Sequence, residues 1–251
     1  MTGVDSERST SSAAASALTG LDMLVDGLRE LGPDRSVSSV MQLITGVAVA
    51  SLAGADEAGL TLLTADRFTT KAPTSDVPTT VDALQYEHGG PCLDAVLDDE
   101  DGTVIQVDDL RTEQRWPGFA SAAVEQTPVL SMLSYCLCLD RGEPIGSLNL
   151  YATKPHAFDP EAVQAGKRLA AYAATGLAFA IAQAKARNLE IALDSNRDIG
   201  AAIGILMSQH RVTRDQAFDL LAAASQHSHR KLRDLADDVI QTGVLDQPTR
   251  C

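Results

Sequence analysis

The sequence predicts an α+β protein in which a long helix joins two folded parts. Alanine is abundant while aromatic residues make up only 4%, which favours helix over an all-β sandwich. Short apolar or β-branched runs bounded by Gly, Pro and Asp fill the middle of the chain, and the pattern becomes helical after Asp159. We therefore expect an antiparallel sheet with flanking helices, a helical stalk and a C-terminal three-helix bundle.

Composition and charge restrict the classes of function. The 251 residues are 45% hydrophobic, enough to bury a core, and 20 Lys+Arg against 34 Asp+Glu give a net charge of −14. This charge argues against non-specific DNA coating and against an anionic membrane surface, but a local basic face remains open. The N-terminus lacks a cationic segment before an apolar run, and the most apolar stretch, 169–182, is too short for a membrane span. We expect a soluble, cytoplasmic protein.

The first elements read as a tail and two helices. Residues 1–16 are Ser/Ala/Thr-rich and are expected to be disordered, and an N-terminal domain is expected over 17–185. An apolar seam at 3-4-3 spacing predicts a short helix that ends at Gly32-Pro33, and a second helix follows at about Val37–Ala50. The seam consists of Leu21, Leu24, Leu28 and Leu31.

The sheet is expected from five runs, with helices between them. The last two strands alternate residue by residue around a hairpin turn at 141–144. Leu148 and Leu150 fall on one face of the last strand, and Ser147, Asn149 and Tyr151 on the other. The strands are predicted at 58–65, 67–72, 103–110, 129–138 and 145–151, and the helices at 81–86, 92–97 and 116–124.

A helix of some fifty residues is predicted to begin at Asp159-Pro160-Glu161, where Asp is the N-cap and Pro the first helical residue. We expect 169–180 to pack on the chain's own sheet. A 4-3-4-3 seam with a central Asn predicts a coiled coil over 181–193 and hence a homodimer through the stalk. The seam residues are Leu177, Ile181, Ala184, Asn188 and Ile191.

The C-terminal fifty residues predict three short amphipathic faces that bury one small core. Thr213 and Gln216 form a capping box, a polar turn is expected at 225–228, and Gly243 is expected to end the last helix. The three faces are Ile199, Ile203, Leu206 and Met207; then Ala217, Phe218, Leu220, Leu221 and Ala224; then Leu232, Leu235, Ala236, Val239 and Ile240.

Several motifs in this region resemble the ANTAR family of RNA-binding modules in bacterial transcription antiterminators. They are NRDIGAAIGILM (196–207), AF (217–218) and SQHSHRKLRDLA (225–236), and the resemblance covers about 189–243 within an expected domain at 186–246. Residues 36–185 resemble a GAF sensor domain through QYEHGGPCLDA (85–95) and GSLNLYA (146–152) with FDP (158–160). The order of the two is similar to actinobacterial regulators.

The resemblance implies a signal-responsive antiterminator that has RNA as its partner. A dimer would present two modules, each binding one hairpin loop of a tandem stem-loop RNA, which prevents a terminator hairpin from forming. Residues 190–251 carry 7 basic and 9 acidic residues, so 7 − 9 = −2, against −12 for the rest. We expect RNA contacts from Arg197, Arg211, Arg214, His229, Arg230, Lys231 and Arg233.

Other interpretations of these residues stay open. Arg230–Asp234 and Arg233–Asp237 are i, i+4 pairs, which are common on solvated helix faces. Gly200 and Gly204 allow the close approach of another helix, which we favour, or of RNA. Where this chain has Ile203 the family usually has a basic residue, and where it has His229 the family often has Asn. Both departures affect the expected RNA affinity.

The remaining candidates are weaker. His88 and Cys92 flank a Gly-Gly-Pro turn and could ligate a metal or haem, but a structural loop is favoured. Cys136 and Cys138 are expected to be buried thiols, too close for a disulfide in a regular strand. His210, His227 and His229 are expected to be solvated turn residues.

No catalytic constellation or metal site is predicted, and the ligand and any cofactor stay unknown. The alternatives to RNA binding are a helix-turn-helix that binds DNA, a sensor that acts on a protein partner, and a reductase that uses Cys92 or the pair Cys136 and Cys138.

Overall fold

The computed structural model describes residues 19–33, 35–64, 67–97, 104–139 and 144–245. The chain divides into two compact units, Met1–Ala182 and Gln183–Cys251. A five-stranded antiparallel sheet with flanking helices, a long helix and further C-terminal helices confirm the predicted α+β class. The predicted disordered tail, 1–16, and residues 141–143 of the hairpin turn predicted at 141–144 lie outside the described residues.

The sheet has the strand order β2-β1-β5-β4-β3, and all neighbouring strands are antiparallel. Every strand was expected, but β3 is shorter than the predicted run because the chain bends after Val107. The strands are β1 (Glu57–Thr64), β2 (Arg67–Lys71), β3 (Val104–Val107), β4 (Ser131–Cys138) and β5 (Pro144–Ala152).

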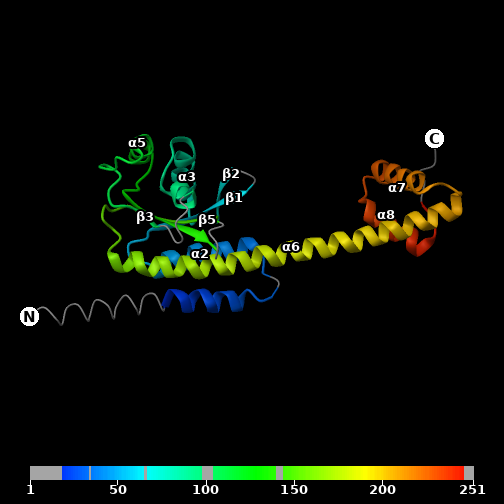
Figure 1. Ribbon diagram of the computed structural model, residues 1–251, viewed down its shortest axis with the longest axis horizontal. Helices are drawn as coiled ribbons and strands as arrows, with labels where there is room; N and C mark the ends of the chain where they lie inside the picture. Colours follow the sequence, from blue (N-terminus) through cyan, green and yellow to red (C-terminus); the bar gives the residue numbers. More distant parts are fainter. Residues whose placement is uncertain (1–18, 34, 65–66, 98–103, 140–143, 246–251) are drawn as a thin grey trace, which may run out of the picture. The chain divides into compact units, whose positions relative to one another are not determined.

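One face of the sheet is apolar and packs on helices. α2 (Val37–Ser51) and the first part of α6 (Pro160–His210) run beneath this face, and the helical residues 19–30 lie alongside them (Figure 1). Leu148 and Leu150 of β5 join this core with Leu24 of the N-terminal helix. Gly27 brings that helix so close to α2 that a Cβ would lie 2.4 Å from the Leu43 side chain.

The opposite face is covered by α3 (Asp76–His88), α4 (Pro91–Leu97) and α5 (Pro117–Gln126). Phe119, Met132 and Tyr151 belong to a second apolar cluster on this side. Both faces of β4 and β5 are therefore buried, although residues 147–150 of β5 alternate between polar and apolar.

Helix α6 begins as predicted, since the Asp159 carboxylate accepts a hydrogen bond from the Ala162 N–H at 2.7 Å. It continues for 51 residues. Its early part is buried against the sheet up to Leu177 and Ala180, whereas every residue in 188–194 is exposed.

In the second unit the end of α6 packs with α7 (Arg214–Ser228) and α8 (Leu232–Thr242) around one apolar core. The capping box of Thr213 and Gln216 is present, and Gly243 ends α8 at φ 73°. The polar turn predicted at 225–228 is wrong: α7 continues to Ser228, whose hydroxyl bonds to the carbonyl of Ala224. Met207, Phe218 and Ile240 were expected in the core but are exposed.

Candidate nucleic-acid interface and sensor site

The three helices of the second unit are held by a small core, and their connecting turns carry cations. Leu206, Leu221 and Val239 are fully buried, one from each helix. Burying such a side chain stabilises by about 1.5–3 kcal/mol. The core therefore fixes the two turns, so that their side chains are presented from defined positions.

Both turns place a non-glycine residue in the left-handed region. Arg211 follows α6 and His229 follows α7, each with φ 53°. Glycine is the usual residue in this conformation, because a Cβ adds strain there. Arg211 and Arg214 flank the first turn, and His229, Arg230 and Lys231 form the second.

All seven predicted RNA-binding residues are exposed, but they do not form one patch. The two turns lie at opposite ends of α7, whose 15 residues span about 22 Å. Arg197 lies within α6, before the first turn. The length of α7 also keeps His210 away from His227 and His229. The cations of the first turn and those of the second turn are therefore separate groups rather than one basic surface.

Two of these cations pair with carboxylates, in pairs other than those predicted. Arg230 contacts Asp238 at 2.7 Å and Arg233 contacts Asp234 at 3.2 Å, in place of Arg230–Asp234 and Arg233–Asp237. For Arg230 the difference arises because α8 begins at Leu232, so Arg230 is not in the helix and the i, i+4 geometry does not apply to it. Arg233 and Asp237 both lie in α8, and there Asp237 accepts a hydrogen bond from Gln241 instead. Exposed ion pairs contribute about 0–1 kcal/mol, so a phosphate could replace the carboxylate at little cost.

Gly200 and Gly204 lie inside α6, where glycine costs about 1 kcal/mol relative to alanine. A Cβ built on either glycine meets nothing within 4 Å. Among the described residues no helix packs against them, which leaves the predicted close helix contact without support within the chain. Ile203, which occupies the position where a basic residue was expected from the family resemblance, is buried in the small core.

The first unit (Met1–Ala182), which contains the region that resembles a GAF sensor domain, is called the sensor unit. It contains a second candidate site, which the sequence patterns did not predict. Asp82 of α3 is fully buried against the face of the sheet that carries Ser147 and Asn149, which is called the polar face. Its carboxylate accepts hydrogen bonds from Thr61 (3.2 Å), Thr70 (2.9 Å) and Gln85 (3.1 Å). The Tyr151 hydroxyl also donates to it. Burial raises the pKa of Asp82 to about 6, although these hydrogen bonds oppose the rise.

Beside this cluster three buried polar atoms have no hydrogen-bond partner. They are the hydroxyls of Ser134 and Ser147 and the Oδ1 oxygen of Asn149, and all three side chains are fully buried. Asn149 lies directly opposite Ser134 in the β4–β5 ladder, and Ser147 is two residues away on the same face. An unpaired buried polar group costs about 1–3 kcal/mol. Three such atoms together form a polar site whose hydrogen-bonding groups a water molecule or a small polar ligand would satisfy.

Helix α4 packs over these strands and carries Cys92. The Cys92 N–H donates to the Gln85 side chain at 2.8 Å, which links α4 to the Asp82 cluster. Burial raises the pKa of the Cys92 thiol well above its ordinary value. His88, which with Cys92 flanks the Gly-Gly-Pro turn, is exposed. The described residues contain no group of three potential metal ligands.

Cys136 and Cys138 form a disulfide, so the prediction of two buried thiols is wrong. The physical reason is a register irregularity at Leu137/Cys138, which makes this end of β4 depart from a regular strand. The two Cα atoms are 5.5 Å apart, within the usual range for a disulfide. Cys136 lies opposite Ser147, so the disulfide borders the polar face.

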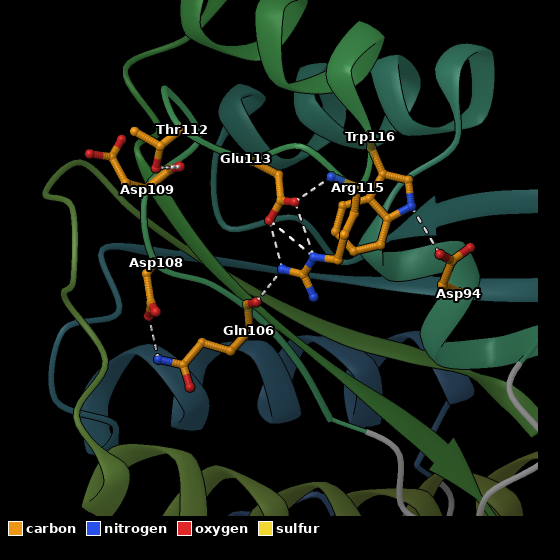
Figure 2. A network of polar contacts seen from close by, with 8 residues as sticks. All are labelled: Asp94, Gln106, Asp108, Asp109, Thr112, Glu113, Arg115 and Trp116. Atoms are coloured by element: carbon orange, nitrogen blue, oxygen red, sulfur yellow. Dashed lines mark hydrogen bonds and ion pairs between the residues drawn. The ribbon is translucent and has the colours of Figure 1, made fainter.

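A surface network fastens the loop between β3 and α5 (Figure 2). Arg115 contacts Glu113 at 2.6 Å, donates to the carbonyl of Gln106 and lies 4.5 Å from the ring centre of Trp116. The Trp116 indole donates to Asp94 of α4 at 2.9 Å. These partners hold α4 to the start of α5, and therefore hold the cover of the polar face in place.

The polar face has a signal in the sequence of β5. Ser147 and Asn149 were placed opposite Leu148 and Leu150, but helices were expected on the faces of the sheet. Small polar residues on a covered face indicate a buried polar site. Asp82 and Gln85 gave a weaker signal, since they fall beside Val81 and Leu84 on the face of one helix.

Comparison with known families agrees with this architecture. The GAF domain model matches residues 34–178, more than half of the chain, and the protein therefore belongs to the GAF domain family. An ANTAR domain, an RNA-binding antitermination regulator domain, follows at residues 187–240. The chain is thus a GAF-regulated ANTAR protein, and the predicted resemblance is confirmed.

Solved structures with a similar fold include GAF domains of two phosphoenolpyruvate-protein phosphotransferases. The one from Acinetobacter is 17% identical, covers 66% of this chain and 97% of its own, and has a TM-score of 0.48. The one from Coxiella burnetii is 18% identical, covers 67% of this chain and 98% of its own, and has a TM-score of 0.49. No curated protein matches the chain. Among the described residues no helix has the length and apolarity to cross a membrane.

Proposed function

We propose that this protein is a homodimeric, signal-responsive transcription antiterminator that binds tandem stem-loop RNA. The ANTAR domain carries the proposal, because it coincides with a three-helix unit whose two turns present exposed cations. Each copy binds one stem-loop, through Arg and Lys contacts to phosphates and contacts to unpaired loop bases. The bound pair of stem-loops excludes an overlapping terminator hairpin, and transcription continues.

The stalk supports the dimeric part of this proposal. Ile181, Asn188 and Ile191 of the predicted seam are exposed on α6, and an isolated amphipathic helix gains little from such a stripe in water. Pairing the seams of two copies buries the apolar residues and places Asn188 where it can fix the register. The second unit (Gln183–Cys251) is the output unit of this proposal. Two output units in one dimer match two stem-loops in one RNA.

The sensor unit binds a small polar ligand at Ser134, Ser147 and Asn149. The ligand supplies at least one hydrogen-bond donor, because the unpaired Oδ1 of Asn149 can only accept. Ligand binding stabilises the packing of α4 on β4 and β5 and biases the stalk between two states. The protein acts without catalysis: the buried Cys92 thiol, with its raised pKa, lacks the properties of a nucleophile.

Equilibrium binding of the full-length protein to three matched nucleic acids tests the RNA proposal. We expect tandem stem-loop RNA to bind at least 10-fold more tightly than a single stem-loop, since the second contact is intramolecular. Duplex DNA of the same length should bind more weakly than either. Preference for duplex DNA would support the helix-turn-helix alternative, and failure to retain any stem-loop would leave a protein partner as the target.

A thermal-shift screen with small polar metabolites tests the sensor proposal. A ligand present at 100 times its dissociation constant should stabilise the sensor by about 2.7 kcal/mol. Asn149→Leu should abolish that shift, whereas Thr80→Ala, a change at an exposed α3 residue, should preserve it. A ligand shift that survives Asn149→Leu would place the ligand elsewhere.

A further inference from the structure

The output unit contains a groove between α6 and α7 that the predicted cations do not explain. Its volume is about 740 Å³, in the range of small-ligand sites. All of its lining residues belong to the second unit. They are Asn196, Ile199, Gly200 and Ile203 of α6 and Arg214, Asp215, Phe218 and Asp219 of α7.

Gly200 keeps one wall of this groove free of a side chain. Other glycines of the chain are required by internal packing: a Cβ on Gly27 or Gly166 would collide with Leu43 or Tyr135. In the part of the chain that the structure describes, no atom other than those of the adjacent turns of α6 lies within 4 Å of a Cβ at Gly200. Close packing within the protein therefore does not account for this glycine, and the open space is available to a bound molecule.

Phe218 provides an aromatic surface at the same place. The sequence pattern assigns it to the core, yet its neighbours Ala217 and Leu221 occupy the core and Phe218 is 44% exposed. Ile199 and Ile203 line the groove opposite it on α6. An exposed aromatic ring beside apolar side chains is the arrangement on which unpaired nucleic-acid bases stack.

The polar lining favours a base over the phosphate backbone. Asp215 and Asp219 are carboxylates, which repel phosphate but accept hydrogen bonds from the amino and imino groups of a base. The Asn196 amide can donate and accept, and Arg214 adds one cation at the start of α7. The groove therefore combines stacking, hydrogen-bond acceptors and limited positive charge.

We propose that this groove binds one unpaired RNA base that carries hydrogen-bond donors on its edge, stacked on Phe218 and received beside Gly200. This inference rests on the proposed RNA-binding function and adds the site where sequence is read. The exposed cations at the turns then supply affinity for the backbone, while the groove supplies discrimination between loops.

Two variants of the full-length protein test the groove from opposite directions. Phe218→Ala removes the stacking surface and should weaken binding of tandem stem-loop RNA about 10- to 100-fold, while Phe218→Tyr should retain it. Gly200→Leu fills the open space and should weaken binding similarly while raising the melting temperature, because leucine is the better helix former. Gly46→Leu, at another exposed helical glycine with open space, is the matched control and should bind RNA normally.

Salt dependence separates base binding from phosphate binding. The loss caused by Phe218→Ala should be the same factor at every salt concentration, because no phosphate contact is removed. An abasic nucleotide at one loop position should reproduce the loss and should add nothing further to Phe218→Ala. Replacing that base by an analogue without its amino group should weaken wild-type binding but not binding by Asp219→Ala, which has no acceptor at this position.

The outcomes distinguish this inference from the proposed function. If wild-type protein binds tandem stem-loops and both Phe218→Ala and Gly200→Leu bind as tightly, the groove is not a base site, although RNA binding stands. If wild-type protein binds no stem-loop, both proposals fall. If Gly200→Leu instead converts the dimer to monomer, the groove belongs to a contact between two copies and the inference is overturned.

Discussion

The two units place their polar groups in opposite ways. In the sensor, Asp82, Asn149 and the neighbouring hydroxyls are buried between the sheet and its covering helices, where each unpaired atom is costly. In the output unit the charged candidates are all exposed, around a small core of apolar residues. Changes at the sensor site should therefore affect stability and binding together, whereas changes at the output cations should affect binding alone.

The largest expected effect lies in α6, the helix that both units share. Ile181→Glu combined with Ile191→Glu places four charges in the proposed seam of the dimer. Burying an isoleucine is worth about 1.5–3 kcal/mol, so loss of four should weaken dimerisation by at least about 1,000-fold. Sedimentation equilibrium measures this directly, and the variant should be monomeric at micromolar concentration.

Leu193→Glu is the matched control for the seam. Leu193 is 61% exposed on the same helix but falls two residues after Ile191, on the opposite side. This variant should remain dimeric. If it dissociates as readily as the double variant, the dimer does not use the predicted seam.

The next largest effect concerns the exposed cations of the output unit. It tests whether replacing them weakens RNA binding while the unit remains folded. Replacing Arg230, Lys231 and Arg233 by Glu should weaken RNA binding by about 100-fold or more at low salt. It should also lower the salt slope by about one for each phosphate contact that is lost. Unfolding free energy should change by less than about 1 kcal/mol, because exposed ion pairs contribute little.

The same charge change in the sensor is the control for net charge. Arg67, Lys71 and Lys167 are exposed in the first unit, and replacing them by Glu changes the total charge by the same amount. RNA affinity should fall far less than in the output variant. Equal losses would mean that long-range repulsion, rather than contact at the second turn, governs the result.

The third expected effect is a dependence of stability on pH, caused by the buried Asp82 carboxyl group. The folded protein binds the Asp82 proton more tightly than the unfolded chain, since the pKa rises from 3.8 to about 6. The contribution of this proton binding to the free energy of unfolding is complete below about pH 4 and is lost as the pH rises through about 6. The shift corresponds to about 3 kcal/mol.

Denaturant unfolding of wild type and Asp82→Asn at pH 4.5 and pH 7 measures this contribution. The stability difference between the two proteins should change between these pH values, because only wild type titrates at this position. Tyr86, Tyr151 and Cys92 face Asp82, but burial raises their pKa values, so they stay neutral throughout. A constant difference would mean that Asp82 is ionised across the range.

The elements that the sequence predicted well are those set by local chemistry. The start of α6 at Pro160 and the capping box at Thr213 depend on neighbouring residues, and both are present. Phe218 was misassigned because helical periodicity gives a face but not its width, so residues at the edge of an apolar stripe can point outward. The end of α7 was misplaced because Ser225 and Ser228 bond to backbone carbonyls without ending the helix.

The sensor site was harder to predict because it depends on contacts distant in sequence. Asp82 meets Tyr151, 69 residues away, and Asn149 meets Thr61, 88 residues away. No local pattern specifies which helix covers which strand. The disulfide was missed for a similar reason: a strand irregularity at Cys138 is a property of the β4–β5 pairing, not of the two cysteines.

The smallest expected effect comes from the surface network around Arg115 in the sensor unit. It tests whether the solvent exposure of a polar contact, or the number of further groups it touches, decides how much unfolding free energy is lost with the contact. Arg115→Lys removes the two-pronged contact with Glu113, whose side chain is only 8% exposed, and the stacking on Trp116. We expect a loss of about 1 kcal/mol in chemical unfolding. Arg111→Lys is the matched control, because Arg111 contacts Asp109 at the same distance of 2.6 Å and, among the described residues, has no aromatic ring stacked on it. This change should cost less. RNA affinity should be unchanged in both. Equal costs would show that Trp116 adds nothing to the network, and the sensor's surface would then behave like the output unit's exposed pairs.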